Sequence, residues 1–420
     1  MRRFILFFGV ISLLLDFYVY QGIKRVSVNW RSDKLKKTVR WGYWLFFIAF
    51  NICFTFVIYQ RFSSGEATVF MKWVMNLFLA FFVTKLVFVL VLFGEDLVRV
   101  AISLYRLVRK TFSETATDRK LMPGRRKFVS QAAIILASIP FASFLYGMVK
   151  GKYQYTVHRH TLFFEDLPAA FDGFKITQLS DIHAGSFDDP EAVQRGIDLV
   201  KAQKSDLFVF TGDLVNDHAT EVVPYMNHFK QLRAPFGQFS VLGNHDYGMY
   251  VQWPSEAAKE KNLNDLKKHH AEMGYRLLLD EAVTIEKGGE KLSLIGVENW
   301  GKGFIQIGNL DKALANVADD AFKILLSHDP SHWEEVVKHH KKRVHLTLSG
   351  HTHGMQFGVE TPLFKWSPAQ FRYKTWAGLA EEAGRLLYVN RGFGFIGFSG
   401  RVGIWPEITV LELRKGKASA

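Results

Sequence analysis

Cysteine is almost absent from this chain of 420 residues, which contains only Cys53. A single thiol cannot form an intrachain disulfide, so an oxidising compartment is neither required nor excluded. Cys53 is also absent from the clusters of Asp, Asn and His described below, which argues against a thiolate metal site. A metal in this protein would therefore be bound by histidine, carboxylate or amide side chains.

Acidic residues are scarce in the first 149 positions, which hold 7 Asp and Glu against 21 Lys and Arg. From residue 150 onward the counts are nearly equal, 33 acidic against 32 basic, so the net charge of +13 belongs to the N-terminal region. A nucleic-acid-binding domain needs a basic face, which the C-terminal region's net charge does not support. We expect a lipid bilayer as a partner and no nucleic acid, because basic loops suit anionic lipid head groups.

Long apolar runs are confined to the N-terminal region, at 4–20, 41–59, 69–93 and 128–149. Each approaches the ~17–25 residues that a helix needs to cross a bilayer. The sequence therefore predicts four transmembrane helices over residues 1–149 and a separate domain over 150–420. The first run is short and contains Asp16. A removable signal peptide is the alternative interpretation of residues 4–20, but no small-residue cleavage site follows them.

The loops between the predicted spans differ strongly in charge. Residues 21–40 hold seven Lys and Arg, residues 60–68 hold one, and residues 94–127 hold nine. The positive-inside rule places the first and third loops in the cytoplasm and the domain beyond residue 150 outside. The stretch GRRKFVS (124–130) resembles a twin-arginine export signal, or is simply a basic anchor; both interpretations give the same orientation.

Two charged residues lie inside the predicted spans. Asp16 and Lys85 would differ in depth by roughly 6 Å at about 1.5 Å per residue, which is within reach of a lysine side chain. Charges in hydrocarbon are usually paired or functional, so we hypothesise an ion pair between them.

Five short apolar runs in the C-terminal region end in residues of metal-binding types. They read KITQLSDIH (175–183), LFVFTGD (207–213), FSVLGNHD (239–246), KILLSHD (323–329) and HLTLSGHTH (345–353). Their composition favours β-strands, and helical spacing at 191–203 and 262–274 completes an α/β pattern. Because strand ends converge at a sheet edge, we expect one cluster, formed by Asp181, His183, Asp213, Asn244, His328, His351 and His353.

Imidazole and carboxylate ligands suit zinc, iron(II) and manganese. Seven ligands are too many for one tetrahedral ion. Two ions about 3.5–4 Å apart that share a carboxylate would use them all, and such a pair clamps a phosphoryl group during in-line displacement. Glycines at 350 and 354 would let His351 and His353 turn toward different targets.

The ordered motifs DIH, GDLVND, GNHD, SHD and GHTH resemble those of the calcineurin-like metallophosphoesterase superfamily, over roughly residues 155–413. The resemblance implies a four-layer α/β/β/α sandwich with two divalent ions, either manganese, zinc or iron. It implies that Asp213 bridges the ions. One ion would also be held by Asp181, His183 and His353, and the other by Asn244, His328 and His351.

The same resemblance implies that His245 protonates the leaving oxygen and that Asp246 fixes the tautomer of its ring. A hydroxide generated by the metals would be the nucleophile. The motifs depart from protein Ser/Thr phosphatases, which carry an arginine after the second motif and a glutamate ending the third. The tail at 388–413 is more similar to bacterial membrane-associated or exported phosphodiesterases. Its Arg391 and Arg401 would bind a phosphate or be two solvated arginines.

These features predict a membrane-anchored phosphoesterase that hydrolyses a phosphodiester or pyrophosphate in a lipid, lipid-linked or envelope substrate. One alternative is a hydrolase of a nucleotide-linked lipid precursor, resembling UDP-diacylglucosamine pyrophosphatases, which would require a cytoplasmic domain. Another is a metal-stabilised scaffold or sensor without activity. An aromatic run, Phe364 to Trp376, would line an acyl-chain groove, touch the bilayer or pack as a cap.

Overall fold

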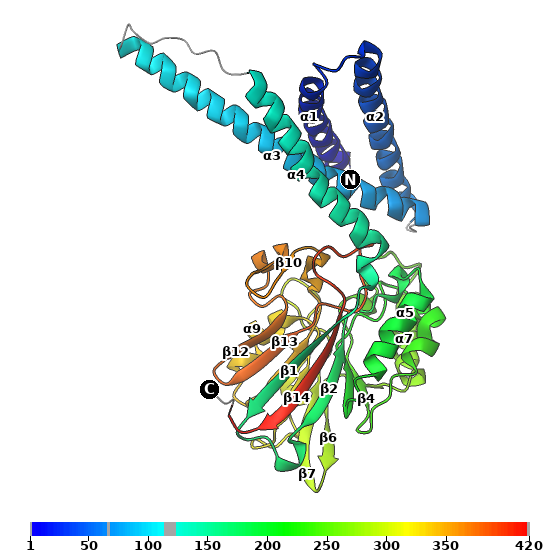
Figure 1. Ribbon diagram of the computed structural model, residues 1–420. Coiled ribbons are helices and arrows are strands. Elements are labelled where there is room, and N and C mark those ends of the chain that lie inside the picture. Colours follow the sequence, from blue (N-terminus) through cyan, green and yellow to red (C-terminus); the bar gives the residue numbers. More distant parts are fainter. Residues whose placement is uncertain (1, 65–67, 113–122, 418–420) are drawn as a thin grey trace. The chain divides into compact units, whose positions relative to one another are not determined.

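A computed structural model describes residues 2–64, 68–112 and 123–417 (Figure 1). The chain divides into two compact units, Met1–Tyr146 and Gly147–Ala420. Each unit has its own secondary structure, helical in the first and mixed α/β in the second.

The first unit consists of long apolar helices: α1 (Arg2–Val26), α2 (Asp33–Ser64), α3 (Val69–Phe112) and α4 (Pro123–Val149). Three stretches of the described residues are long and apolar enough to cross a membrane, namely Asp33–Gln60, Val69–Val108 and Lys127–Val149. The expected span at 4–20 lies in α1, which is not one of these three. The expected loop after residue 93 is in fact helical as far as Phe112. The GRRKFVS stretch begins α4, but the side chains of its arginine pair lie outside the described residues.

The predicted ion pair joins α1 to α3. Lys85 Nζ lies 2.6 Å from Asp16 Oδ1, and both side chains are buried. The Tyr43 hydroxyl donates to the same carboxylate at 2.8 Å, and Lys85 Nζ also lies 3.9 Å from the centre of the Phe47 ring. The hypothesis of an Asp16–Lys85 pair is therefore confirmed, and the pair satisfies both charges within the helical unit.

Two six-stranded sheets form the second unit. The first sheet has the order β1 (Thr156–Phe164), β14 (Glu407–Lys415), β2 (Phe174–Leu179), β3 (Leu207–Phe210), β4 (Gln238–Ser240) and β5 (Arg276–Leu277). All its neighbouring strands are parallel except the β14–β2 pair.

The second sheet has the order β12 (Gly378–Glu382), β13 (Arg385–Val389), β9 (Leu346–Ser349), β8 (Lys323–Leu326), β7 (Glu290–Gly296) and β6 (Glu281–Lys287). Its four central strands are parallel, and its two edge pairs are antiparallel. A small hairpin of β10 (Val359–Glu360) and β11 (Lys365–Trp366) stands apart from both sheets.

The sheets pack face to face over a buried core that includes Ile176 from the first sheet and Ile324 from the second. Helices α5 (Pro190–Lys201) and α7 (Glu256–Glu272) cover the outer face of the first sheet (Figure 1). The short helices α8 (Leu310–Ala313) and α9 (Pro330–Glu335) cover the second. The four-layer α/β/β/α prediction is confirmed. Helix α7 begins earlier than expected because Ser255 caps it, accepting a hydrogen bond from Ala258 N.

All five predicted runs form strands, namely β2, β3, β4, β8 and β9. Three belong to the first sheet and two to the second, so the expected single sheet edge is wrong. The candidate ligands instead follow the carboxyl ends of parallel strands in both sheets, and they meet at one edge of the sandwich.

Candidate metal centre

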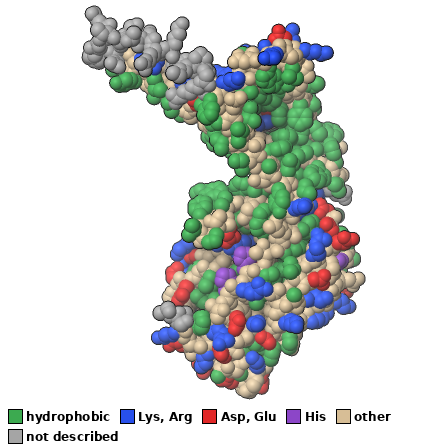
Figure 2. All heavy atoms as spheres, viewed as in Figure 1, with side chains coloured by type: hydrophobic (Ala, Val, Ile, Leu, Met, Phe, Trp, Pro, Cys, Tyr) green, Lys and Arg blue, Asp and Glu red, His purple; other side chains and the backbone are tan. Residues whose placement is uncertain are grey.

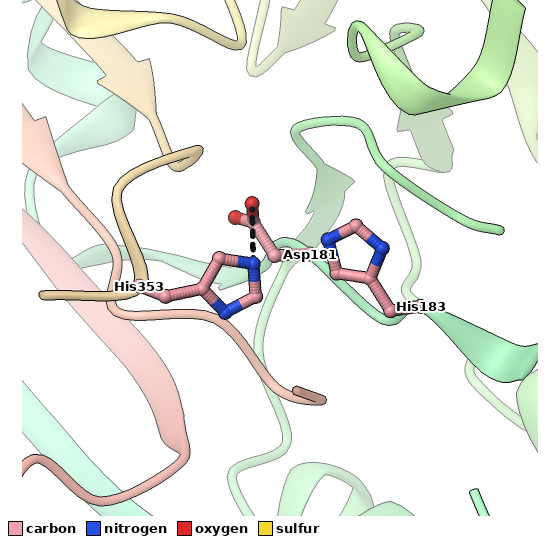
Figure 3. Close-up of side chains that lie close together, drawn as sticks. All are labelled: Asp181, His183 and His353. Atoms are coloured by element: carbon pink, nitrogen blue, oxygen red, sulfur yellow. Dashed lines mark ion pairs between the residues drawn. The ribbon is translucent and has the colours of Figure 1, made fainter. Parts of the chain in front are cut away.

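Asp181, His183 and His353 form the first group of candidate ligands (Figure 3). Their ligand atoms lie within 4.8 Å of one another, and His353 Nε2 is 3.3 Å from Asp181 Oδ1. No described residue hydrogen-bonds to either ring nitrogen of His183 or to Nε2 of His353, although these atoms are buried. Buried polar atoms are rarely left unsatisfied, so this group fits a bound metal ion.

Asp213, His328 and His351 form the second group. His328 Nε2 lies 3.2 Å from Asp213 Oδ2 and 3.2 Å from His351 Nδ1. The same Asp213 oxygen lies 3.5 Å from His183 Nε2 of the first group. One carboxylate is therefore close to a histidine of each group, which is the geometry that a shared ligand of two ions requires.

Asn244 lies beside this second group in the pocket wall. Its Nδ2 donates to the Tyr250 hydroxyl at 2.8 Å, while its buried Oδ1 has no hydrogen-bond partner among the described residues. The tyrosine thus orients the amide, and the carbonyl oxygen is available as a neutral metal ligand.

Hydrogen bonds behind the ligands orient two of the imidazole rings. His328 Nδ1 lies 2.7 Å from the Thr211 carbonyl and donates to it, so Nε2 is the nitrogen that can lose its proton and bind a metal. On His351 the arrangement is reversed, since Nε2 lies 2.8 Å from the Tyr373 hydroxyl and Nδ1 faces His328. Each ring therefore directs one nitrogen toward Asp213 and its neighbours.

The backbone at the site is strained. Five candidate ligands have left-handed backbone conformations, with φ values between 47° and 71°: Asp181, His183, Asp213, His351 and His353. A non-glycine residue adopts this region rarely and at a cost of about 1–3 kcal/mol. Such strain concentrates at functional sites, where the surrounding fold holds ligands in place.

At two glycine positions near the ligands there is no room for a side chain. A Cβ on Gly350 would lie 1.9 Å from Ser180 Oγ and 2.2 Å from Asp181 Oδ2, and a Cβ on Gly243 would lie 2.2 Å from Asp213 Oδ1. Gly354, in contrast, has a φ of 53°, as expected of a flexible position. Gly350 therefore serves close packing against Asp181 rather than flexibility.

Burial and charge act differently on the histidines. Burial lowers the pKa of His183, His351 and His353, which keeps these rings in the neutral form that binds metals. Burial also disfavours the charged form of His328, but the carboxylates of Asp213 and Asp181 outweigh it and raise its pKa to about 10. A metal ion must therefore displace a proton from His328.

The expected role of Asp246 is wrong. Its buried carboxylate accepts four backbone hydrogen bonds, from Gly243, Asp213, Leu214 and Val215. The ring of His245 is oriented instead by the Asn216 carbonyl, 2.7 Å from Nδ1. Residues His245–Tyr247 form a 3₁₀ turn, in which consecutive side chains point about 120° apart. The Asp246 carboxylate therefore holds the backbone of the loop that carries Asp213.

Neither interpretation of Arg391 and Arg401 was correct, because both side chains are buried inside the domain. Arg391 forms ion pairs with Glu360 and Glu407. Arg401 donates to the carbonyls of Arg391 at 2.8 Å and Gly392 at 3.1 Å, and its Nη2 lies 3.1 Å from His353 Nδ1. Both arginines hold the glycine-rich segment and its neighbours in place, and they do not line the pocket.

A pocket of about 200 Å³ opens over both groups of ligands. His245 lines it, as expected of a residue that meets the substrate, together with Phe304, Arg372 and Tyr373. The Arg372 side chain is exposed, and its guanidinium lies 4.6 Å from the centre of the Phe304 ring. Sequence reasoning missed Arg372 and the contact between Tyr373 and His351. The only signal for them was the aromatic run, whose distance from the motifs indicates no particular partner.

Both parts of the chain match known family models. Residues 1–152 match a model described as "Probable Calcineurin-like phosphoesterase, transmembrane domain", and residues 174–355 match one described as "Calcineurin-like phosphoesterase". The first match includes α1 as well as the three apolar stretches found in the structure.

Several proteins are similar to this chain over part of its length. The metallophosphoesterase YkuE of Bacillus subtilis is 31% identical over 265 residues, covering 61% of this chain and 84% of YkuE. A metallophosphoesterase of Aquifex aeolicus is 30% identical over 272 residues, covering 64% of this chain and 94% of that protein. The "Transmembrane protein with metallophosphoesterase domain" of Danio rerio is 26% identical over 274 residues, covering 64% of this chain and 60% of that protein.

Proposed function

Because this chain belongs to the calcineurin-like metallophosphoesterase family, we propose that it hydrolyses a phosphodiester or pyrophosphate in a lipid, lipid-linked or envelope substrate. The observation that carries the proposal is the Asp213 carboxylate, which lies within 3.5 Å of a histidine from each ligand group. Two divalent ions bound there would activate a water molecule and neutralise charge on the phosphoryl oxygens. The nitrogen and oxygen ligands suit manganese, zinc or iron.

His245 is positioned to protonate the leaving oxygen. Its backbone N–H donates to Asp213 at 2.9 Å, and its Nδ1 contacts the Asn216 carbonyl, so both the backbone and the ring are held. The ring also packs against Tyr250, with 4.4 Å between ring centres. A positioned acid of this kind contributes about 10²–10⁴-fold to the rate.

Arg372 takes the role that the sequence suggested for Arg391 and Arg401. It is exposed at the pocket, and the rings of Phe304 and Tyr373 lie 4.6 Å and 5.6 Å from its guanidinium. A guanidinium binds phosphate oxygens through paired hydrogen bonds. We propose that Arg372 binds an anionic group of the substrate next to the scissile bond.

The domain is proposed to act outside the cytoplasm. The support is the distribution of Lys and Arg, seven in residues 21–40 and nine in 94–127 against one in 60–68. Labelling of single introduced cysteines with an impermeant maleimide in intact cells, in a Cys53→Ser background, tests this orientation. A protected domain would overturn it and favour the cytoplasmic lipid-precursor hydrolase.

The full-length protein, stripped with a chelator and supplied with manganese, zinc or iron, tests the activity on bis-p-nitrophenyl phosphate and p-nitrophenyl phosphate. We expect metal to restore turnover of the diester in the parent and in Asp217→Asn, a control on the same loop. Asp213→Asn should not recover. Turnover that survives chelation or Asp213→Asn would contradict the site, and a preference for the monoester would contradict the substrate class. Two bound ions without turnover of either compound would favour the scaffold.

A further inference from the structure

Five large apolar side chains are exposed between the metal-binding loop and Arg372. Leu363 is 99% exposed, Phe371 82%, Phe364 58%, Met355 51% and Val359 47%. We call these five residues the apolar tip. They belong to the β10–β11 hairpin and the two short turns that flank it, His353–Gln356 and Pro368–Phe371. Figure 2 shows hydrophobic side chains gathered at this end of the domain. Such a patch marks a surface that contacts a membrane or a protein.

The residues of the aromatic run from Phe364 to Trp376 differ in burial. Tyr373 and Trp376 are buried in a small cluster with Ile404, so they pack as a cap. Phe364 and Phe371 have no comparable burial and face solvent. The exposed residues are therefore not needed for packing the cap.

The apolar tip borders the pocket. Met355 lines the pocket wall, and Phe371 immediately precedes Arg372, which lines it too. The two turns that carry Met355 and Phe371 also contact each other. A surface that bound the apolar tip would therefore lie beside the pocket mouth.

The apolar tip is also tied to the end of the last membrane-spanning helix. α4 ends at Val149, and its Gly147 carbonyl accepts a hydrogen bond from Arg401 N at 3.2 Å. The next residue, Val402, donates to the Gln356 carbonyl at 2.8 Å and accepts from Gly358 N at 2.9 Å. The segment leading into β10 is therefore hydrogen-bonded to the loop that holds the end of α4.

The opposite end of the sandwich differs in character. The β6–β7 hairpin lies far from β10 in Figure 1, and the strand ends beside its turn carry the charged residues Glu286, Lys287, Glu290 and Lys291. This charged hairpin should stay in water, so it offers a matched control position for labelling.

From these observations we infer that the apolar tip inserts into the surface of the same bilayer that holds the transmembrane helices. Aromatic and aliphatic side chains are favoured at the boundary between the lipid head groups and the acyl chains. The insertion would place the pocket mouth and Arg372 at the level of lipid head groups. The substrate class that follows, a phosphoester carried by a membrane lipid, rests on the proposed function; the insertion itself does not.

A fluorescent label tests the insertion in the full-length protein. Leu363→Cys and, as the control, Lys291→Cys are each labelled with NBD in a Cys53→Ser background and placed in phosphatidylglycerol nanodiscs. We expect the Leu363→Cys label to emit at shorter wavelength and to be quenched by lipids with a nitroxide on the acyl chain. The Lys291→Cys label should remain unquenched. Equal, water-like emission at both positions would overturn the inference.

Activity separates this inference from the proposed function. Leu363→Glu combined with Phe364→Glu should keep its turnover of bis-p-nitrophenyl phosphate in detergent within about twofold. The same variant should lose at least about tenfold on a fluorogenic phosphodiester lipid in nanodiscs. If the parent hydrolyses neither compound, the proposed function fails while the quenching still decides the insertion. Quenching with unchanged turnover of the lipid would overturn the substrate assignment.

Discussion

Replacing Asp246 with asparagine tests whether this carboxylate supports the backbone or the His245 ring. One carboxylate oxygen accepts from Leu214 and Val215 N–H, and the other accepts from Gly243 and Asp213 N–H. The asparagine NH₂ group would face two N–H donors and leave them without an acceptor. A buried donor without a partner costs about 1–3 kcal/mol, so we expect a loss of about 2–6 kcal/mol.

Thermal unfolding of the full-length, metal-free protein in detergent measures this loss. For a domain of this size 1 kcal/mol corresponds to roughly 2–4 °C, so the C-terminal unit should melt roughly 4–24 °C lower. Asp217→Asn is the control, because among the described residues its side chain accepts one backbone hydrogen bond, from Tyr250 N at 3.2 Å. The reasoning would be refuted if Asp246→Asn melted like Asp217→Asn and lost only its activity on substrates with poor leaving groups.

Three further predictions concern proton transfer, metal binding and the membrane helices. His245→Gln should lower kcat/KM about 10²–10⁴-fold for alkyl leaving groups but much less for p-nitrophenol; an equal loss across a leaving-group series would exclude an acid role. In the metal-free protein the His328 pKa is about 10 instead of 6.5, so its proton stabilises the fold below pH 6.5, and this stabilisation disappears as pH rises toward 10. Manganese affinity should therefore rise with pH over the same range, because the ion must displace the His328 proton. Calorimetry in buffers of different ionisation enthalpy should show that manganese binding releases a proton. Binding without proton release would contradict the raised pKa of His328. Asp16→Asn and Lys85→Met should each cost about 3–5 kcal/mol, and the double variant should cost less than their sum in thermal unfolding; additive losses would argue against coupling.

The strands and the candidate ligands could be predicted because each depends on a local pattern. A short apolar run favours a strand, and the polar residues that follow it must lie at its carboxyl end. The Asp16–Lys85 pair was also accessible, since the rise of a helix fixes the depth of each residue.

The remaining assignments depended on partners that sequence spacing does not identify. Arg391 is paired with Glu360, which lies 31 residues earlier, and Arg401 is satisfied by backbone carbonyls. No local rule distinguishes such buried arginines from phosphate-binding ones. Asp246 was misassigned because adjacency to His245 says nothing about side-chain direction in a 3₁₀ turn.

The close approaches of Gly243 and Gly350 make the motifs depend on one another. Each glycine leaves room for the carboxylate of a different motif, Asp213 for the first and Asp181 for the second. A substitution at either glycine would therefore damage a ligand that is more than twenty positions away in the chain. The motifs cannot be transplanted singly into another scaffold, and they can be inherited or engineered only as a complete set.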